Sequence, residues 1–593
     1  MSRSVQLSNS CCRKESAGLT GKLERITGLA FTPGLLLGAL LLSGCGEKTS
    51  VFGSAELCVS ERTPIPTIQG DGYRSPLEDR YQLTGGIVTR IEPGNGYYIE
   101  QIEHDSPAAA SKAVFVQWHG EAGKAEPGHR VAVGGRVREL GSQRDTLTGI
   151  SEIDRFAVCD TGLPLPLTRT ELPLGNPQRE ALEGMRISIA QTLHVTDNYS
   201  ARHGELTLSA GETLRIPTED HAPGAAARRA DRDNRERALT AHSTSWSAEK
   251  LAAGSRVDQL TGIFGHRRER QQLLTESVRT SPAAMPKRID PPDSGHIRAV
   301  SANLLNFFNG NGRGAGFPTE RGAETAAEFK AQSARIRAAF NALQPDLLAV
   351  QELENDGFGR HSAAQSLLDL LGPEYAVIRT PENRIGDDVI TVGLFYRTSV
   401  LQPTGAAQTL GKGPFANLSR EPLAQAFRVR ESGAVFLAAV NHLKSKGGCP
   451  EDRDSANADQ GQGCWNPVRV ESVATLLPWL RTLSRTANTD LVLVLGDMNA
   501  YRREDPVERF RGGGYVELVE HYSGLPQHSY RFFGRAGTLD YAFATPALAA
   551  RTAQALIWHI NADWPRGMDL PQPWLRMSDH DPVVIDLALD DSP

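Results

Sequence analysis

The stretch LVLVLGDMN at residues 491–499 decides the fold of the second half of this 593-residue chain. Its alternating Leu and Val residues are typical of a short strand buried inside a sheet. Asp497 and Asn499 stand just where that strand ends. Loops at strand ends are where a rigid sheet presents reactive side chains, so we expect both residues in a functional site.

The same arrangement recurs along the chain. Apolar runs at residues 297–302, 347–350 and 435–440 are each followed by polar side chains, and two further polar groups stand near residue 540 and before the last apolar run at 583–585. An acid after one strand is usually a turn or cap residue, but six such places in one order indicate a common site. The candidate residues are Asn303, Glu352, His442, Asp497, Asn499, Asp540, Asp579 and His580.

Strand candidates alternate with helices through residues 294–593. Phe329, Ile336, Phe340 and Leu343 fall on one face of a helix, and the apolar runs suit buried strands. We therefore predict an α+β fold whose catalytic domain is a four-layer α/β sandwich, with two packed mixed β-sheets flanked by helices.

Two small β modules are expected in front of this domain, because 593 residues are too many for one hydrophobic core. Residues 61–160 hold several short strand candidates at close spacing, which is typical of a small barrel. Residues 161–280 predict a second β module with a charged, Ala-rich segment that suits a solvated helix or a disordered loop. The prolines of residues 281–293 indicate a linker. A basic cluster at residues 266–270 fits either a solvated surface or a contact with a DNA backbone.

Residues 1–44 have the pattern of an export signal, with basic residues before a short apolar run. The run ends in LSGC at residues 42–45, which resembles the lipobox of bacterial lipoproteins and implies lipidation of Cys45; Gly46 favours the outer membrane. Residues 45–60 would be the lipidated tether. We expect an exported protein that is lipid-anchored at the cell envelope or extracellular. An ordinary signal peptide with a chance cysteine is the alternative.

Four cysteines remain beyond the signal and the lipobox, namely Cys58, Cys159, Cys449 and Cys464. Their even number suits disulfides in an oxidising compartment. Three pairings are open, and the local one, Cys58–Cys159 with Cys449–Cys464, keeps each bridge inside one predicted domain. A four-cysteine zinc site competes, but no C-x-x-C spacing supports it.

The order of the strand-end motifs resembles the endonuclease/exonuclease/phosphatase superfamily, whose members include deoxyribonuclease I. The segments QELEND (351–356), HLKSKGGC (442–449) and GCWN (463–466) are most similar to secreted bacterial endonucleases of the ExeM/NucH type. The front module resembles the OB-like domain of such nucleases in QGDG (69–72) and GNGYY (94–98). In an OB fold, Tyr97, Tyr98 and Trp118 would stack on bases or pack in the core, and core packing is favoured for at least half of them.

The resemblance implies an oxygen-ligand metal site. Glu352, helped by Asn303 and Asp579, would hold one Mg²⁺ or Mn²⁺, as hard cations require. Ca²⁺ is an alternative cation for the acidic loop between Cys449 and Cys464. That loop lacks EF-hand spacing, so a solvated loop closed by a disulfide is preferred.

The resemblance also implies the chemistry. His442 and Asn499 would contact the scissile phosphate. His580 would accept a proton from the attacking water, with Asp540 fixing its tautomer, while Asp497 would share the base role or position the water.

One departure from the family pattern lies before the strand that ends near residue 397. Thr391 stands where many relatives have Lys, which leaves the phosphate contact near this strand open. We expect Asp388 beside the site without a catalytic role.

Three functions compete. The first is an extracellular metal-dependent nuclease that cuts DNA, with RNA as a further substrate. The second keeps the fold but acts on a phospholipid or another phosphoester, for which an exposed apolar hairpin would be typical. The third is a non-catalytic DNA-binding lipoprotein. The net charge of −6 gives no electrostatic footprint for nucleic acid. The expected partners are DNA and, through the lipid anchor, a membrane; no protein partner is inferred.

Overall fold

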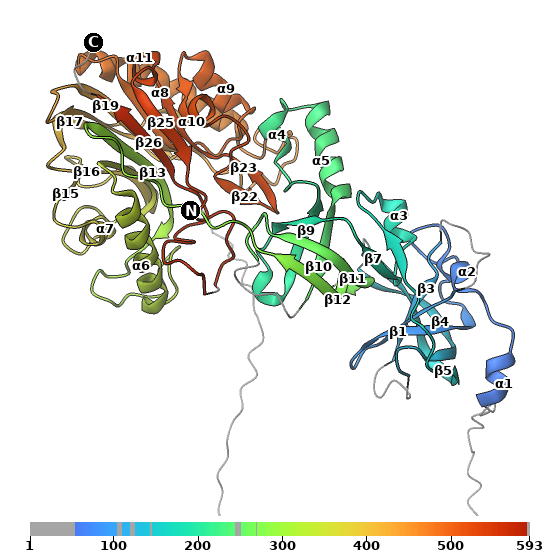
Figure 1. Cartoon of the computed structure of the whole chain (residues 1–593). Coiled ribbons are helices and arrows are strands. Elements are labelled where there is room, and N and C mark those ends of the chain that lie inside the picture. The colour runs from blue at the N-terminus through green and yellow to red at the C-terminus, as the bar shows by residue number, and fades with distance from the viewer. Residues whose placement is uncertain are drawn as a thin grey trace, which may run out of the picture. The chain divides into compact units, whose positions relative to one another are not determined.

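The computed structural model describes residues 54–102, 110–118, 125–142, 145–243, 251–268, 270–567 and 569–589 (Figure 1). The predicted export signal, the lipobox Cys45 and most of the tether lie outside these residues. Within them, no helix combines the length and the apolar character needed to cross a membrane.

The first module is a closed five-stranded barrel. Its elements are α1 (Ser54–Val59), α2 (Ile65–Gln69), β1 (Tyr81–Glu92), β2 (Gly96–Glu100), β3 (Ala113–Gln117), β4 (Arg130–Ser142) and β5 (Asp145–Asp160). The strands close in the order β1-β2-β3-β5-β4, with β3 parallel to β5. A disulfide between Cys58 and Cys159 fastens α1 to β5.

The aromatic residues of the barrel are mostly core residues. Tyr97 and Tyr98 are 0% and 1% exposed, and the half-buried Trp118 packs edge-on against Phe156 at 5.2 Å between ring centroids. The favoured role in core packing is thus confirmed for both tyrosines, and neither offers a stacking platform at the surface. The OB-like assignment itself stays a prediction.

The second module is a seven-stranded sheet in the order β12-β10-β9-β8-β11-β7-β6, in which β12 also pairs with β11. Its elements are β6 (Thr168–Thr170), α3 (Asn176–Glu180), β7 (Arg186–Ile189), β8 (Leu193–Asp197), the 3-10 helix η1 (Ala201–His203), β9 (Glu205–Ala210), α4 (Pro217–Asp220), α5 (Ala225–Arg237), β10 (Ala238–His242), β11 (Arg256–Arg267) and β12 (Arg270–Ser281). The Ala-rich segment forms α5, and the described residues of the basic cluster lie at the end of β11 and the start of β12.

The catalytic half begins after an extended linker and has two six-stranded sheets. The first sheet has the order β15-β16-β14-β13-β26-β25 and the second β17-β18-β19-β20-β24-β21. The strands are β13 (His296–Phe307), β14 (Leu347–Glu354), β15 (Tyr375–Val377), β16 (Ile390–Arg397), β17 (Leu401–Thr409), β18 (Leu423–Val429), β19 (Val435–His442), β20 (Val492–Asp497), β21 (Val516–Glu517), β24 (Asp540–Ala544), β25 (Thr552–Ile557) and β26 (Val583–Ala588). A separate hairpin pairs β22 (Tyr530–Phe532) with β23 (Arg535–Gly537).

Helices complete the layers of this half. They are α6 (Ala326–Leu343), α7 (Ala363–Leu371), the 3-10 helix η3 (Gly413–Ala416), α8 (Asn466–Thr486), α9 (Asp505–Gly512), α10 (Leu518–Ser523) and α11 (Pro546–Ala549). Thr325 caps α6, whose buried face includes Ile336 and Phe340 as the sequence predicts, while α8 buries Leu476 against the second sheet. The two mixed sheets and their flanking helices confirm the α+β prediction (Figure 1).

Sheet topology brings the predicted residues together. β13 runs parallel to β14, and β19 runs parallel to β20, so the carboxyl ends within each pair meet at one edge. β24 and β26 are antiparallel to their neighbours and begin at Asp540 and Val583. The predicted site residues at these strand ends and strand starts therefore lie in one region, to which both sheets contribute.

Candidate active site

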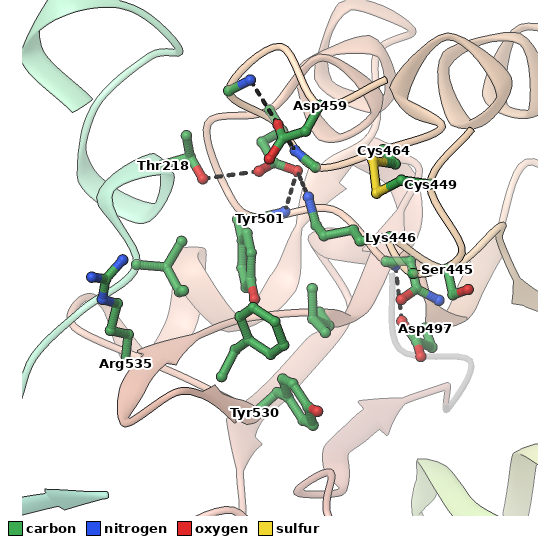
Figure 2. Close-up of a pocket in the computed structure, with 18 of the residues that line it drawn as sticks. Thr218, Ser445, Lys446, Cys449, Asp459, Cys464, Asp497, Tyr501, Tyr530 and Arg535 are labelled. Atoms are coloured by element: carbon green, nitrogen blue, oxygen red, sulfur yellow. Dashed lines mark hydrogen bonds and ion pairs between the residues drawn. A yellow bond between two sulfur atoms is a disulfide. The ribbon is translucent and has the colours of Figure 1, made fainter. Parts of the chain in front are cut away.

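A cavity of about 1180 Å³ opens where these strand ends meet (Figure 2). Five of the residues predicted from sequence line it, namely Glu352, His442, Asp497, Asn499 and His580. Asn303 lies beside it, because its Nδ2 atom is 3.4 Å from Oδ2 of Asp497. The structure thus gathers residues that are separated by as many as 277 positions in the chain, counted as 580 minus 303.

His580 is held by Asp540. Its Nδ1 atom lies 2.7 Å from Oδ2 of Asp540, and the hydroxyl of Ser529 donates to the same oxygen at 2.7 Å. Burial lowers the pKa of His580, but the carboxylate of Asp540 outweighs it, and the pKa stands well above the usual histidine value. The imidazole is therefore oriented through Nδ1, and its protonated form is stabilised.

The backbone of the His580 loop is fixed by Asn561. The side-chain amide of Asn561 donates to the carbonyl of His580 at 2.5 Å, and its carbonyl oxygen accepts from the backbone N–H of Met577 at 2.9 Å. Asp581 accepts from the backbone N–H of Asn561 at 2.6 Å. The ring of Tyr530 packs on His580 at 4.5 Å between centroids. This shell sets the histidine in one orientation, as a site for proton transfer requires.

Asp497 lies between two histidines. Its Oδ2 atom is 3.6 Å from Nε2 of His442 and 4.0 Å from Nδ1 of His580. Burial raises the pKa of the Asp497 carboxyl, whereas the charge of His580 opposes that rise. Its other oxygen accepts from the backbone N–H of Asn499 at 2.8 Å. Asp497 thus places a buried carboxyl beside both histidines, at distances longer than a hydrogen bond.

His442 is neutral at ordinary pH. Burial, aided by the positive charge of Arg420, puts the pKa of His442 well below its usual value. Asn499, on the neighbouring loop, donates through Nδ2 to the carbonyl of Leu443 at 3.1 Å. A neutral imidazole can donate one N–H bond to a phosphate oxygen, which agrees with the role that the resemblance implies.

Two predicted site residues have a left-handed backbone. Asn499 has φ +47° and Glu352 has φ +60°. Asn tolerates this region, but a Glu with positive φ is uncommon and costs energy. Such positions gather at functional sites, where the surrounding structure fixes them.

The residues predicted to hold a metal fit a divalent cation. Burial raises the pKa of Glu352, and the negative charge of Asp579 raises it further, so the two carboxylates repel each other. Among the described residues, neither has a Lys, Arg or His nitrogen within 4.0 Å. Asn303 adds an amide in hydrogen-bond contact with Glu352. An all-oxygen set of this charge is what Mg²⁺ or Mn²⁺ takes.

Two groups of three possible ligands occur among the described residues, with ligand atoms within 4.8 Å of one another. One consists of Asp497, Asp540 and His580. The other consists of His528, His559 and Asp563, where Nε of Arg531 already lies 2.6 Å from the carboxylate. The guanidinium of Arg531 therefore already balances the charge of Asp563 in this second group, which disfavours a metal ion there.

The acidic loop of residues 449–464 is closed by the predicted disulfide between Cys449 and Cys464. Asp459 faces the cavity, but its Oδ1 atom accepts two backbone N–H groups, from Gly461 at 2.8 Å and Gly463 at 2.9 Å. In the described part of the chain this loop forms no group of three metal-ligand side chains. The geometry favours the solvated loop over a calcium site.

Sequence reasoning missed two arginines that line the cavity, Arg321 and Arg420. Asp388 pairs with both, at 3.2 Å from Nε of Arg420 and 3.8 Å from Arg321, so it lies beside the site as expected. Thr391 is buried and faces the backbone of Ile385. The positive charge that a Lys at position 391 would supply is therefore available from the arginines, which no strand-end pattern marks.

The second module also forms part of the cavity wall, through α4 and α5. The hydroxyl of Thr218 on α4 donates to Glu504 at 2.9 Å, and Glu504 in turn pairs with Lys446 (Figure 2). On α5, Asp231 pairs with Arg535 of the β22–β23 hairpin at 2.5 Å. Sequence patterns gave no sign of this contribution.

Asp579 is placed differently from the other predicted ligands. It is half-buried and lines a second, neighbouring cavity with Tyr530 and Arg576. It acts on the first cavity through its charge, which raises the pKa of Glu352.

A family model matches the part of the chain that holds this site. Residues 300–580 match the model of the Endonuclease/Exonuclease/phosphatase family. A search of curated proteins returned no match. Among solved structures, the chain is similar to the human Nocturnin catalytic domain, with 19% identity over 50% of this chain and 95% of that one and a TM-score of 0.33.

Two further structures have comparable similarity. A mannosyl-6-phosphatase from Bacteroides thetaiotaomicron has 17% identity over 49% of this chain and 99% of that one, with a TM-score of 0.34. TDP2 from D. rerio, complexed with a single strand DNA product, has 15% identity over 50% of this chain and 99% of that one, with a TM-score of 0.33. The family match and the strand-end site together establish that residues 300–580 form a domain of the endonuclease/exonuclease/phosphatase family.

Proposed function

We propose that this protein is a metal-dependent nuclease that hydrolyses phosphodiester bonds in DNA. The family establishes a hydrolase acting on phosphoesters. One observation carries the finer proposal: the His580–Asp540 pair opens onto the same cavity as Glu352 and Arg420. That cavity therefore holds an oriented base, a metal-binding carboxylate and a cationic wall for phosphate.

The residues divide the work as follows. Since Nδ1 of His580 donates to Asp540, Nε2 of the deprotonated ring is the nitrogen that accepts a proton from the attacking water. The raised pKa of His580 means that the fraction of this base form grows as the pH rises. Asp540 then stabilises the imidazolium that forms. We assign the base role to His580 rather than Asp497, because Asp497 is shared between two histidines.

The phosphate is held by other groups. Neutral His442 donates an N–H to a phosphate oxygen. Arg321 and Arg420 offset the negative charge of the phosphate. Glu352, Asn303 and Asp579 would hold the divalent cation, which supplies positive charge for the phosphoryl oxygens.

One observation favours the lipid alternative. The β22–β23 hairpin carries Phe532 and Phe533, which are 50% and 79% exposed, and an exposed apolar hairpin is what a phospholipid phosphodiesterase would need. The hairpin is, however, hydrogen-bonded to the second module, where the backbone N–H of Ile216 donates to Ala536 at 2.8 Å. Its aromatic side chains also lie among arginines, so we prefer the nuclease.

A single assay separates the functions. The purified protein is incubated with plasmid DNA, RNA and sphingomyelin vesicles, each with Mg²⁺ and with excess chelator. Cleavage of DNA that the chelator abolishes supports the nuclease. Release of phosphocholine without DNA cleavage supports the lipid enzyme, and DNA binding without any hydrolysis supports the non-catalytic protein.

We further propose that the protein is exported and anchored by lipid on Cys45, which lies outside the described residues. The LSGC motif of residues 42–45 is the basis. A lipoprotein cysteine carries more than one acyl chain, which gives stable anchoring where a single chain is marginal. Replacing Cys45 by Ser should move the protein from the membrane to the soluble fraction. A soluble parent protein without acyl mass would contradict the anchor.

A further inference from the structure

A second cavity, of about 590 Å³, lies between the second module and the β22–β23 hairpin. Its walls come from β8, β9 and the loop between them on one side, and from the hairpin and the segment around Arg566 on the other. Tyr530 and Phe532 line both cavities. The second cavity therefore adjoins the candidate active site.

The cavity displays aromatic rings to solvent. Tyr199 is 69% exposed and Phe533 is 79% exposed, while Phe532 and Phe533 contact each other at 4.5 Å between ring centroids. Single exposed aromatic residues are common, but three that line one cavity are not explained by the packing of the protein.

Phe533 is held in a strained position. The register pairs Phe532 with Arg535, so Phe533 and Gly534 form a two-residue turn with φ values of +46° and +72°. Such turns favour Asn or Gly at both positions, since other residues resist positive φ. A large aromatic residue at this place gains no burial in return. Strain without a structural benefit is typical of a residue that serves a ligand.

Arginines surround these rings. Arg270 and Arg566 are exposed, and the side chain of neither makes a hydrogen bond or an ion pair with another described residue. Arg531 is 9% exposed and keeps one buried nitrogen, Nη1, without a partner, although its Nε atom pairs with Asp563. Arg270 belongs to the basic cluster of residues 266–270, whose role the active site leaves open.

Acidic groups face the arginines as well. Asp197 is mostly buried, and burial raises the pKa of its carboxyl. Glu205 accepts a hydrogen bond from Gln272 at 3.3 Å, and Asp579 is assigned to the metal site. The two exposed arginines thus remain the groups free to meet an anionic ligand.

The cavity has fixed walls. The backbone N–H of Ala536 donates to Leu214 at 2.8 Å, and the side chain of Thr196 donates to the carbonyl of Gly534. The amide of Asn198 donates to the carbonyl of Asp563 at 2.8 Å. A hairpin that inserts into a membrane would protrude, whereas this one is hydrogen-bonded to the second module through its turn and β23 and forms one wall of the cavity.

We propose that this second cavity binds unpaired nucleotides of a DNA strand next to the bond that is cut. Bases stack on Phe533 and Tyr199, and the neighbouring phosphates meet Arg270 and Arg566. Bases can reach these rings only when they are unpaired, so the cavity selects single-stranded over duplex DNA. The inference rests on the proposed nuclease function.

The test compares the cleavage of two substrates in the presence of Mg²⁺. One is a single-stranded 20-mer oligonucleotide, and the other is bis(p-nitrophenyl) phosphate, which is too small to extend from one cavity into the other. Phe533→Asn removes the ring and supplies a residue that the turn favours, so the fold is retained. Tyr73→Asn is the matched control, because Tyr73 is 63% exposed and lies on the barrel.

Loss of one base-stacking contact should lower kcat/KM on the oligonucleotide, relative to that on the small substrate, by roughly 5- to 150-fold in Phe533→Asn. Tyr73→Asn should keep the ratio of the parent. Arg270→Gln combined with Arg566→Gln should reduce the slope of log affinity against log salt by about 1.4, since each phosphate contact on a single strand contributes about 0.7.

Each result has one consequence. If the parent cleaves the small phosphodiester but no DNA, the proposed nuclease function fails. If the parent cleaves the oligonucleotide and Phe533→Asn keeps the ratio of the parent, the second cavity is no nucleotide site and this inference is overturned. If Phe533→Asn instead loses binding to phosphatidylserine vesicles while its oligonucleotide cleavage is unchanged, the hairpin serves a lipid surface and the inference is likewise overturned.

Discussion

Replacing Asp540 by Asn removes the negative charge that holds Nδ1 of His580 and keeps a side chain of the same size. The two groups are 2.7 Å apart and both are buried, so their contact is a charge-assisted hydrogen bond. Bonds of this kind are worth about 1.5–3 kcal/mol, and here the gain is largest when His580 becomes protonated in the reaction. That range corresponds to a roughly 10- to 150-fold lower kcat.

The full loss of the base would cost about 10²–10⁴-fold, which is the upper limit for Asp540→Asn. Single-turnover nicking of supercoiled plasmid with saturating Mg²⁺ measures the effect, and circular dichroism with thermal melting verifies the fold. Asp490→Asn is the matched control, because Asp490 is exposed just before β20 and should leave the rate unchanged. A folded Asp540→Asn protein that nicks plasmid within twofold of the parent would refute the orienting role.

The metal site, the Cys449–Cys464 bridge and the buried Glu219 each allow a further prediction. Glu352→Ala should raise the Mg²⁺ concentration for half-maximal nicking as well as lower the maximal rate, because it removes the buried carboxylate of the metal site; an unchanged Mg²⁺ titration would exclude it as a ligand. Replacing Cys449 and Cys464 by Ser should lower stability by about 3 kcal/mol in urea unfolding, since the bridge closes 15 residues of sequence separation; equal stability would show that the bridge is absent in solution. Burial raises the pKa of Glu219 from 4.5 to about 7, so protonation favours the folded state and stability falls as pH rises between those values. In Glu219→Gln the amide oxygen can replace Oε1, which accepts the backbone N–H groups of Arg502 and Thr538. The free energy of unfolding of Glu219→Gln relative to the parent should rise by up to roughly 3 kcal/mol between pH 5 and pH 8. Parallel curves of stability against pH for the two proteins would contradict this.

The catalytic constellation could be predicted from sequence because its signals are local. Each candidate stands at the end of a short apolar run, as Asp497 ends β20, or precedes one, as His580 precedes β26. Parallel pairing of neighbouring strands then brings the ends together without any further information. For the same reason the two disulfides were predicted correctly, since each closes within one module.

Other features depend on pairings that no local pattern reveals. The wall formed by α4 and α5 requires the segment at Arg215 to bridge Ala536, which is 321 residues away, counted as 536 minus 215. Arg420 lies in a loop, and only the folded chain shows that it faces His442. The aromatic residues of the barrel could not be assigned from sequence either. Base stacking at the surface and packing in the core use the same residue types, and only the burial seen in the structure distinguishes the two roles.

The strained hairpin shows a different limit. YRFFGR at residues 530–535 has the length and the Gly of a tight turn, but sequence alone cannot tell whether its aromatic residues face the core or solvent. In the structure the turn falls at Phe533 and Gly534, which leaves Phe533 exposed. The exposed Phe533 thus departs from the usual rule that large apolar side chains are buried, as a residue of the proposed nucleotide site would.

We propose that His580 and a divalent cation together hydrolyse phosphodiester bonds in DNA. The most direct test measures nicking of supercoiled plasmid by the parent protein and by His580→Ala across a Mg²⁺ series and in excess chelator. We predict that the chelator abolishes nicking by the parent, and that folded His580→Ala is slower by about 10²–10⁴-fold at every Mg²⁺ concentration. Near-parental nicking by His580→Ala, or undiminished cleavage by the parent in chelator, would contradict the mechanism.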